Sequence, residues 1–193
     1  MLESNTLIII ALCFGLIGGL IYLKETLSGQ VKPNRVTYFL WFLLPVIGFF
    51  AAIDQNVGLI AYFTLLNGLV PGCILIASFA NKDAYWKLDK FDYLMGVLAI
   101  IGVALWLITG EGNLAIAFAV LADGLAGIPT IRKAYKQPET ESIIPYSFAA
   151  IGAVLTTISI VTWDFAHYAF PIYFVLLNCS IVLALILGKK KTI

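Results

Sequence analysis

Long apolar segments alternate with short polar ones along the whole chain. An α-helix rises 1.5 Å per residue, so about 20 apolar residues cross the roughly 30 Å hydrocarbon core of a membrane. Seven segments have about this length, and the connections between them carry charges or turn formers such as Asp54 and Gly112. The pattern predicts an all-α integral membrane protein with seven transmembrane helices, near residues 6–23, 37–53, 57–80, 93–109, 113–131, 145–163 and 170–187.

Composition supports a membrane protein, because 61% of the 193 residues are hydrophobic and only 12% are charged. Ordinary soluble domains are about half apolar and about one quarter charged. The first apolar segment lacks both a preceding basic stretch and a following small-residue cleavage site, which a secretory signal would have. We therefore expect this segment to be a transmembrane helix.

Positive charges are confined to alternate connections and the C-terminal tail. The N-terminal segment and the connections around Asp54, Glu111 and Asp164 contain no Lys or Arg. Cytoplasmic loops of membrane proteins are enriched in these residues. The partition predicts a plasma (inner) membrane protein with its N-terminus outside and its C-terminus in the cytoplasm. All twelve basic residues then lie on the cytoplasmic side: Lys24, Lys32, Arg35, Lys82, Lys87, Lys90, Arg132, Lys133, Lys136, Lys189, Lys190 and Lys191.

Similar short sequences recur in the two halves of the chain in the same order. The sequence from Gly15 to Gly18 reads Gly-Leu-Ile-Gly, and the sequence from Gly124 to Gly127 reads Gly-Leu-Ala-Gly. Tyr38 corresponds in the same way to Tyr146, and Leu-Leu-Asn ending at Asn67 recurs as Leu-Leu-Asn ending at Asn178. The collinear matches predict two copies of a three-helix unit, in residues 1–81 and 112–193, joined by a linker helix in residues 82–111.

An odd number of helices in the unit explains the linker. A second three-helix copy joined directly to the first would enter the membrane in the opposite orientation. One additional helix restores the orientation, so the arrangement is predicted to be a 3+1+3 parallel repeat, as in some transporters whose substrate site lies between the repeats.

The plan resembles that of the SWEET and PQ-loop (MtN3-like) superfamily of small-solute transporters. The stretch 127–135, Gly-Ile-Pro-Thr-Ile-Arg-Lys-Ala-Tyr, continuing to 141–146, Glu-Ser-Ile-Ile-Pro-Tyr, is similar to the signature of that superfamily. Pro129 stands where the signature has its proline, whereas Thr130 replaces the glutamine. The resemblance implies that Asn67 and Asn178 line a central cavity, and that Trp163 packs against a sugar.

The paired asparagines also attract attention on physical grounds. Each places an amide at mid-membrane depth, where polar groups face a cavity or bond to another helix. Thr64 shares a helical face with Asn67, and Ser159 shares one with Trp163. The residues predicted to bind substrate are Asn67, Asn178, Trp163, Thr64 and Ser159, and the alternative for the asparagines is a structural hydrogen bond between helices.

Asp123 is the only formal charge deep within a predicted span. Intramembrane carboxylates commonly mark proton or substrate pathways. Asp123 is therefore a candidate for proton coupling, or for a hydrogen bond to a polar solute. The alternative is a protonated or partnered carboxyl that holds helices together.

Prolines within or near the predicted spans can free backbone hydrogen bonds and soften a helix. Pro45, Pro129 and Pro145 are accordingly candidate hinges, although rigid kinks are an equal alternative. The aromatic residues Tyr38, Trp41, Trp86, Tyr93 and Tyr146 lie near predicted membrane interfaces, where an aromatic belt is the ordinary explanation.

Other chemistry has little support in the sequence. The sole histidine, His167, is too isolated for a metal site or a catalytic dyad, and Cys13, Cys73 and Cys179 lie within spans as small hydrophobic residues. No glycine-rich phosphate loop followed by Lys occurs, so ATP-driven transport is not expected. We expect no enzyme activity, no metal, no cofactor and no nucleic-acid partner, and expect the basic loops to face the lipid bilayer.

The combined expectation is a carrier for a small polar solute, with a sugar as the class that the resemblance implies. It would work by alternating access between two three-helix bundles, passively or coupled to protons. The alternatives are a carrier of an amino acid or a vitamin, a seven-helix binding receptor of the KDEL-receptor type, and a purely structural membrane protein. One chain suffices for a transport unit, and a homo-oligomer is also compatible with the sequence.

Overall fold

The computed structural model describes the backbone of residues 2–84, 86–109 and 111–192. Within these ranges the chain forms seven α-helices and two short 3-10 helices, without a β-strand. The all-α fold with seven helices is therefore confirmed. The α-helices are α1 (Leu2–Leu27), α2 (Arg35–Asp54), α3 (Leu59–Ala80), α4 (Lys90–Thr109), α5 (Gly112–Lys136), α6 (Ile143–Ile158) and α7 (Phe165–Thr192), and the 3-10 helices are η1 (Lys82–Ala84) and η2 (Pro138–Thr140).

The length and apolar character of these helices suit a membrane. Five of them, α1, α2, α3, α5 and α7, are long and apolar enough to cross a bilayer. Helix α6 is apolar but has only 16 residues. Several membrane-length apolar helices in one bundle are what an integral membrane protein requires.

The prediction that the sixth span reaches residue 163 is wrong, because α6 ends at Ile158. Ser159 caps the helix, and its hydroxyl donates to the carbonyl oxygen of Thr156 at 2.7 Å. The β-branched Ile160, Val161 and Thr162 that follow have low helix propensity. Ser159 and Trp163 therefore do not share the face of one continuous helix.

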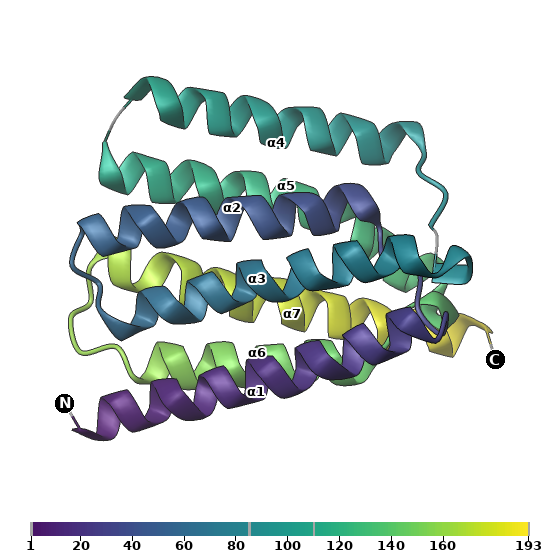
Figure 1. Ribbon diagram of the computed structural model, residues 1–193, viewed down its shortest axis with the longest axis horizontal. Coiled ribbons are helices and arrows are strands. Elements are labelled where there is room, and N and C mark those ends of the chain that lie inside the picture. Colours follow the sequence, from purple (N-terminus) through teal and green to yellow (C-terminus); the bar gives the residue numbers. More distant parts are fainter. Residues whose placement is uncertain (1, 85, 110, 193) are drawn as a thin grey trace.

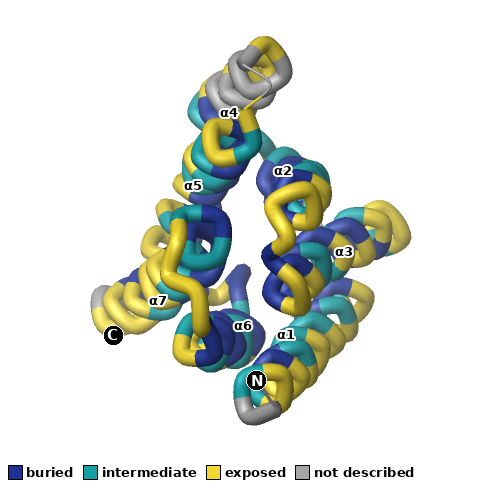
Figure 2. The backbone as a smooth tube through the Cα atoms, turned by 90° about the vertical axis from the view of Figure 1, so that its left-hand side faces the viewer, coloured by how far each residue is buried: buried dark blue, intermediate teal, exposed yellow. Residues whose placement is uncertain are grey.

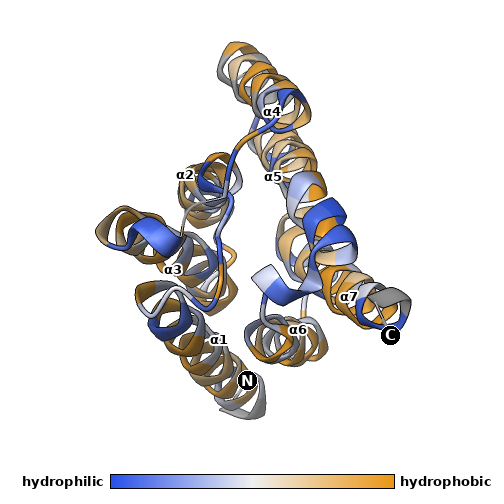
Figure 3. Cartoon of the chain, turned by 90° about the vertical axis from the view of Figure 1, so that its right-hand side faces the viewer, coloured by the Kyte–Doolittle hydropathy of each residue, from blue (hydrophilic) through white to orange (hydrophobic). Residues whose placement is uncertain are grey.

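The helices run side by side along the long axis of the molecule, and successive helices point in opposite directions (Figure 1). Connections with Lys and Arg lie at the end of the bundle where α1 is followed by α2, α3 by α4 and α5 by α6. We call this end the basic end, and the opposite end, which holds the N-terminus, the N-terminal end. Figure 3 views the basic end, where hydrophilic residues gather on the connections.

Six helices form a ring, and α4 lies outside it. Helix α3 packs between α1 and α2, and α7 packs in the same way between α5 and α6. The two triplets meet where α1 packs on α6 and where α2 packs on α5, which closes the ring. Helix α4 packs mainly on the outer side of α5 (Figure 2).

Small residues bring α1 and α6 close together. A Cβ atom at Gly18 would lie 2.9 Å from the carbonyl oxygen of Pro145, and a Cβ at Gly152 would lie 2.9 Å from that of Ala11. Both distances are too short for a real Cβ atom, so only glycine permits this separation of the backbones. Such close approach is typical of helix packing in membranes, where dispersion rather than the hydrophobic effect holds helices together.

Candidate functional site: a central polar cavity

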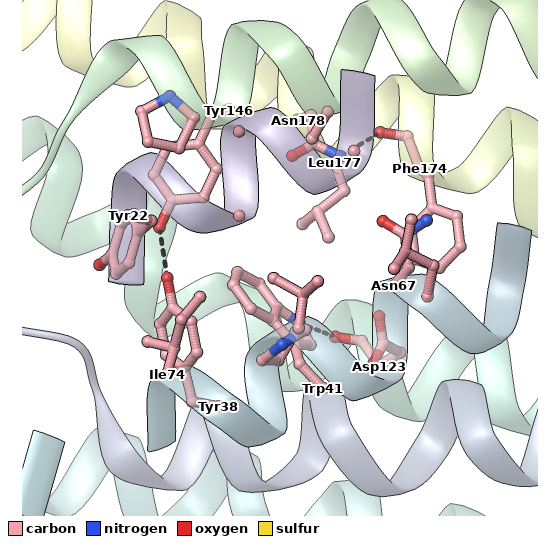
Figure 4. Close-up of a pocket in the computed structure, with 18 residues that line it drawn as sticks. Tyr22, Tyr38, Trp41, Asn67, Ile74, Asp123, Tyr146, Phe174, Leu177 and Asn178 are labelled. Atoms are coloured by element: carbon pink, nitrogen blue, oxygen red, sulfur yellow. Dashed lines mark hydrogen bonds between the residues drawn. The ribbon is translucent and has the colours of Figure 1, made fainter. Parts of the chain in front are cut away.

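A cavity of about 90 Å³ lies inside the ring of six helices (Figure 4). Each of the six ring helices contributes to its lining. A single water needs only about 10–15 Å³ of such space, so the cavity can hold several waters or a small solute. Its polar or aromatic lining residues with a hydrogen-bonding group are Tyr22, Tyr38, Trp41, Asn67, Asp123, Tyr146 and Asn178.

The structure brings Asn67 and Asn178 to the same cavity, from α3 and α7. Each side-chain amide donates to a backbone carbonyl one turn earlier, Asn67 to Phe63 at 2.9 Å and Asn178 to Phe174 at 2.8 Å. The alternative of a direct hydrogen bond from these amides to another helix is therefore not what the structure has. Both asparagines line the cavity, and their binding of a substrate stays a prediction.

Asp123 of α5 also lines the cavity and is only 1% exposed. The hydroxyl of Tyr173 donates to Oδ2 of Asp123 at 2.6 Å, and Trp41 Nε1 donates to the Asp123 backbone oxygen at 3.3 Å. The other carboxyl oxygen, Oδ1, is buried and has no hydrogen-bond partner among the described residues. Burying such an acceptor without a partner is costly, which marks Asp123 as a group that a ligand or a proton can satisfy.

Three tyrosines, Tyr22, Tyr38 and Tyr146, line one side of the cavity together (Figure 4). They lie on the parts of α1, α2 and α6 that are nearest the basic end. The hydroxyls of Tyr38 and Tyr146 lie 3.1 Å apart, and those of Tyr22 and Tyr146 donate to Glu141 Oε2 at 2.7 and 3.1 Å. We call Tyr22, Tyr38, Tyr146 and Glu141 the tyrosine cluster. The expectation that Tyr38, Trp41 and Tyr146 belong to an aromatic belt is wrong, because all three are buried inside the ring.

A buried ion pair adjoins the tyrosine cluster. Lys133 Nζ lies 2.6 Å from Glu141 Oε1, and the two side chains are 1% and 0% exposed. Lys133 also donates to the backbone oxygen of Lys32, which ties the connection between α1 and α2 to the end of α5. The positive charge is therefore both neutralised and hydrogen-bonded, as a buried cation requires.

Sequence reasoning assigned Lys133 to an ordinary basic loop and did not single out Glu141. A signal was nevertheless available, because Asp123, Thr130 and Lys133 are spaced seven and three residues apart and so share one face of a helix. A face that carries Asp123 into the bundle also directs Lys133 inward. The partner, Glu141, lies in a connection, and its position could not be inferred from periodicity.

Apolar side chains lie on the side of the cavity that faces the N-terminal end. Phe174 lines the cavity, and its ring packs edge-on against Phe63 with the centroids 6.1 Å apart. Both rings belong to a buried apolar cluster that also contains Ile8, Ile60 and Phe170. The cavity thus has apolar rings on the side of the N-terminal end and hydrogen-bonded tyrosines on the side of the basic end.

Three residues predicted to bind substrate do not line the cavity. Trp163 is 61% exposed on the connection between α6 and α7, where it stacks on Tyr168. Thr64 is buried on α3 without reaching the cavity lining. Ser159 lines a separate pocket of about 190 Å³ at the N-terminal end, where its carbonyl oxygen accepts a hydrogen bond from Ser4 at 2.6 Å.

The candidate hinge prolines have different settings. Pro145 lies in the first turn of α6 and lines the cavity. A proline costs little there, because the first N–H groups of a helix have no intrahelical partner. Pro45 and Pro129 lie inside α2 and α5, where each removes one backbone hydrogen bond. Their function as hinges remains a prediction.

The histidine at the N-terminal end forms a local contact outside the cavity. Nδ1 of His167 lies 2.7 Å from Oδ1 of Asp164. This side-chain hydrogen bond, together with backbone N–H donors, holds the pKa of Asp164 below its usual range. His167, the only histidine of the sequence, therefore contacts Asp164 and is not among the residues that line the cavity.

The described residues therefore form an all-helical bundle with several membrane-length apolar helices, as in an integral membrane protein, and with a cavity inside a six-helix ring. No family model, no curated protein and no solved structure matches the chain.

Proposed function

We propose that this protein is a membrane carrier for a small polar solute, working by alternating access. The observation that carries the proposal is the cavity that all six ring helices line, with the polar side chains of Asn67, Asn178 and Asp123 on largely apolar walls. A carrier needs groups on each side of its site that can separate, and the cavity has packed aromatic rings on one side and side-chain hydrogen bonds on the other.

The packing of the ring supports a 3+1+3 parallel repeat. The third helix lies between the other two in both triplets, and α4 lies outside the ring, as a linker helix would. The two triplets could rock about the cavity, because they meet only through α1 against α6 and α2 against α5 among the main contacts. In this proposal the protein lies in the plasma membrane, with its basic end facing the cytoplasm and its N-terminus outside.

A sugar is the substrate class that the resemblance to SWEET and PQ-loop transporters implies, and amino acids and vitamins are the alternatives. A receptor of the KDEL-receptor type would need a free cation in the pocket to hold a carboxylate. The buried cation near the cavity, Lys133, is already paired with Glu141. The carrier is therefore favoured over the receptor.

Uptake by proteoliposomes tests the proposal. The purified full chain is reconstituted, and uptake of radiolabelled sugars, amino acids, amines and vitamins is compared with uptake by empty liposomes. The proposal predicts saturable uptake of at least one solute. Absence of uptake across the whole panel by a folded protein would contradict it.

Proton coupling by Asp123 is a separate part of the proposal. If Asp123 exchanges a proton during transport, an imposed pH gradient drives uptake. Asp123→Asn keeps the shape of the side chain but cannot titrate, so uptake should lose its dependence on the gradient. An unchanged dependence in this variant would exclude Asp123 as the coupling residue.

A further inference from the structure

The side-chain hydrogen-bond donors that line the cavity are already used within the protein. Trp41 donates to the backbone oxygen of Asp123, and Tyr22 donates to Glu141. Tyr146 also donates to Glu141, so its oxygen is free to accept, and the Tyr38 hydroxyl 3.1 Å away donates to it. A ligand in the cavity therefore finds no free hydroxyl or indole donor among these residues.

The asparagines present acceptors. A backbone carbonyl oxygen can only accept, so the atoms of Asn67 and Asn178 that contact Phe63 O and Phe174 O must be the NH₂ groups. This fixes the amide orientation from chemistry. The side-chain oxygen of each asparagine has no hydrogen-bond partner among the described residues, so each amide offers a carbonyl acceptor beside the second N–H of its NH₂ group.

Asp123 adds a carboxyl oxygen to these two acceptors. Its Oδ1 is buried without a hydrogen-bond partner within the described part of the chain, and Oδ2 is held by Tyr173. No Lys, Arg or His among the described residues lines the cavity. The nearby cation Lys133 forms its ion pair with Glu141 instead. Burial without a counter-charge favours the protonated carboxyl, so a cationic ligand would bind Asp123 by taking the place of its proton.

The cavity walls suit a cation as well. Trp41, Tyr22 and Tyr38 contribute aromatic rings to the lining. Aromatic faces attract ammonium and guanidinium groups, most strongly where water is excluded. The hydroxyl groups of a neutral sugar could also donate to these acceptors, so the aromatic rings and the carboxyl of Asp123 are the features that favour a cation.

We infer that the central cavity binds a small organic cation with N–H donors, such as a protonated amine, through Asp123 Oδ1 and the side-chain oxygens of Asn67 and Asn178. The inference rests on the proposed function, since it assigns the substrate class of the same cavity. It replaces the expected sugar with a donor-rich cation.

Binding to the purified full chain in detergent tests the inference. The probes are methylammonium, ethanolammonium and butane-1,4-diammonium, with ethylene glycol and glucose as neutral comparisons at equal ionic strength. Ligand that binds the native state raises Tm in a concentration-dependent way. We expect saturable stabilisation by at least one ammonium probe and none by ethylene glycol or glucose. Equal stabilisation by the neutral compounds, or none by any ammonium probe, would overturn the inference.

Variants assign the binding to particular side chains. Asp123→Asn should weaken binding of the best ammonium probe roughly 10- to 100-fold, the usual range for loss of a charge-assisted hydrogen bond. Asn178→Leu removes one neutral acceptor and should weaken it by roughly 5- to 10-fold. Asp54→Asn, at an exposed position at the end of α2, is the matched control and should bind normally. Normal binding by Asp123→Asn would overturn the inference. If that variant fails to fold, the inference is tested by binding to Asn178→Leu and by comparing charged with neutral probes on the wild-type protein.

Uptake separates this inference from the proposed function. Butane-1,4-diammonium is suited to proteoliposomes, because its two charges suppress passive leakage. Binding of the diammonium without uptake would support the inference and contradict the carrier. Uptake of a sugar without binding of any ammonium probe would support the carrier and overturn the inference.

Discussion

Lys133 and Glu141 form an ion pair in which both side chains are removed from solvent, with Nζ and Oε1 2.6 Å apart. Glu141 also accepts hydrogen bonds from Tyr22 and Tyr146, so one carboxylate links the end of α5 to α1 and α6. The pair therefore connects these three helices at the basic end of the ring, next to the cavity.

Glu141→Gln should destabilise the protein because it leaves the Lys133 charge buried without a counter-charge. Removing one partner of a buried ion pair typically costs about 3–5 kcal/mol. Thermal or denaturant unfolding in detergent measures the loss. The matched control is Asp89→Asn, which breaks the exposed Arg132–Asp89 pair at 2.9 Å and should cost at most about 1 kcal/mol. Equal losses in the two variants would contradict the buried role of the pair.

Removing both charges should recover part of the stability. In the double variant Lys133→Met and Glu141→Gln, no unpaired charge remains in the buried site. Replacement of both partners is usually far less costly than replacement of one. A double variant less stable than Glu141→Gln alone would show that Lys133 stabilises the fold through another contact.

Gly18→Ala should separate α1 from α6, since the new Cβ would lie 2.9 Å from the Pro145 carbonyl oxygen. Overpacking of this kind costs about 1–3 kcal/mol. Gly124→Ala is the matched control, because the nearest atom to its added Cβ, on Tyr173, is 3.6 Å away. The control should be neutral or slightly stabilising, as alanine favours a helix over glycine. Tolerance of both substitutions would argue against the close α1–α6 contact.

Trp41 and Trp163 distinguish the observed cavity from the site expected by resemblance. Trp41→Phe loses the indole N–H that holds the Asp123 backbone oxygen, so we expect a several-fold rise in the KM of uptake. Trp163 lies on an exposed connection, so Trp163→Phe should leave uptake unchanged. Kinetics of proteoliposome uptake measure both. A raised KM in Trp163→Phe with an unchanged KM in Trp41→Phe would instead place the solute site at the N-terminal end of the bundle.

The proposed orientation predicts which connections can be labelled from outside the cell. In a chain with its native cysteines replaced by alanine, Glu111→Cys introduces a thiol at the N-terminal end and Glu139→Cys introduces one at the basic end, both at exposed positions. A membrane-impermeant maleimide added to intact cells should label only Glu111→Cys. Labelling of only Glu139→Cys would reverse the proposed topology.

The helices were predictable because each one is formed by an apolar segment between polar connections, although this pattern misplaced the end of α6. The repeated Leu-Leu-Asn sequence also singled out Asn67 and Asn178, which both line the cavity, while their role in substrate binding stays a prediction. Trp163 was misplaced because its assignment assumed a helix that continues through Ile160, Val161 and Thr162, whereas α6 ends before them. Local helix termination decides such cases, and apolar character does not reveal it.

The tyrosine cluster was not predictable for a different reason. Tyr38 and Tyr146 correspond to each other in the repeat, but only the ring closure brings their hydroxyls to 3.1 Å. The contacts of Glu141 depend on how the connection between α5 and α6 packs against the basic end of the bundle. Such contacts join residues more than a hundred positions apart, as from Tyr22 to Glu141, and a single sequence carries no direct signal for them.

Access to the cavity from both sides of the membrane tests the central claim most directly. Ala149→Cys, in the otherwise cysteine-free chain, places a thiol of similar size in the cavity lining, and Ile151→Cys on the exposed face of the same helix is the control. Small impermeant methanethiosulfonates are applied to either side of sealed vesicles. The account predicts that Ala149→Cys reacts from either side, that bound solute protects it, and that Ile151→Cys does not react. Reaction of Ala149→Cys from one side only, or from neither, would contradict a carrier that works by alternating access.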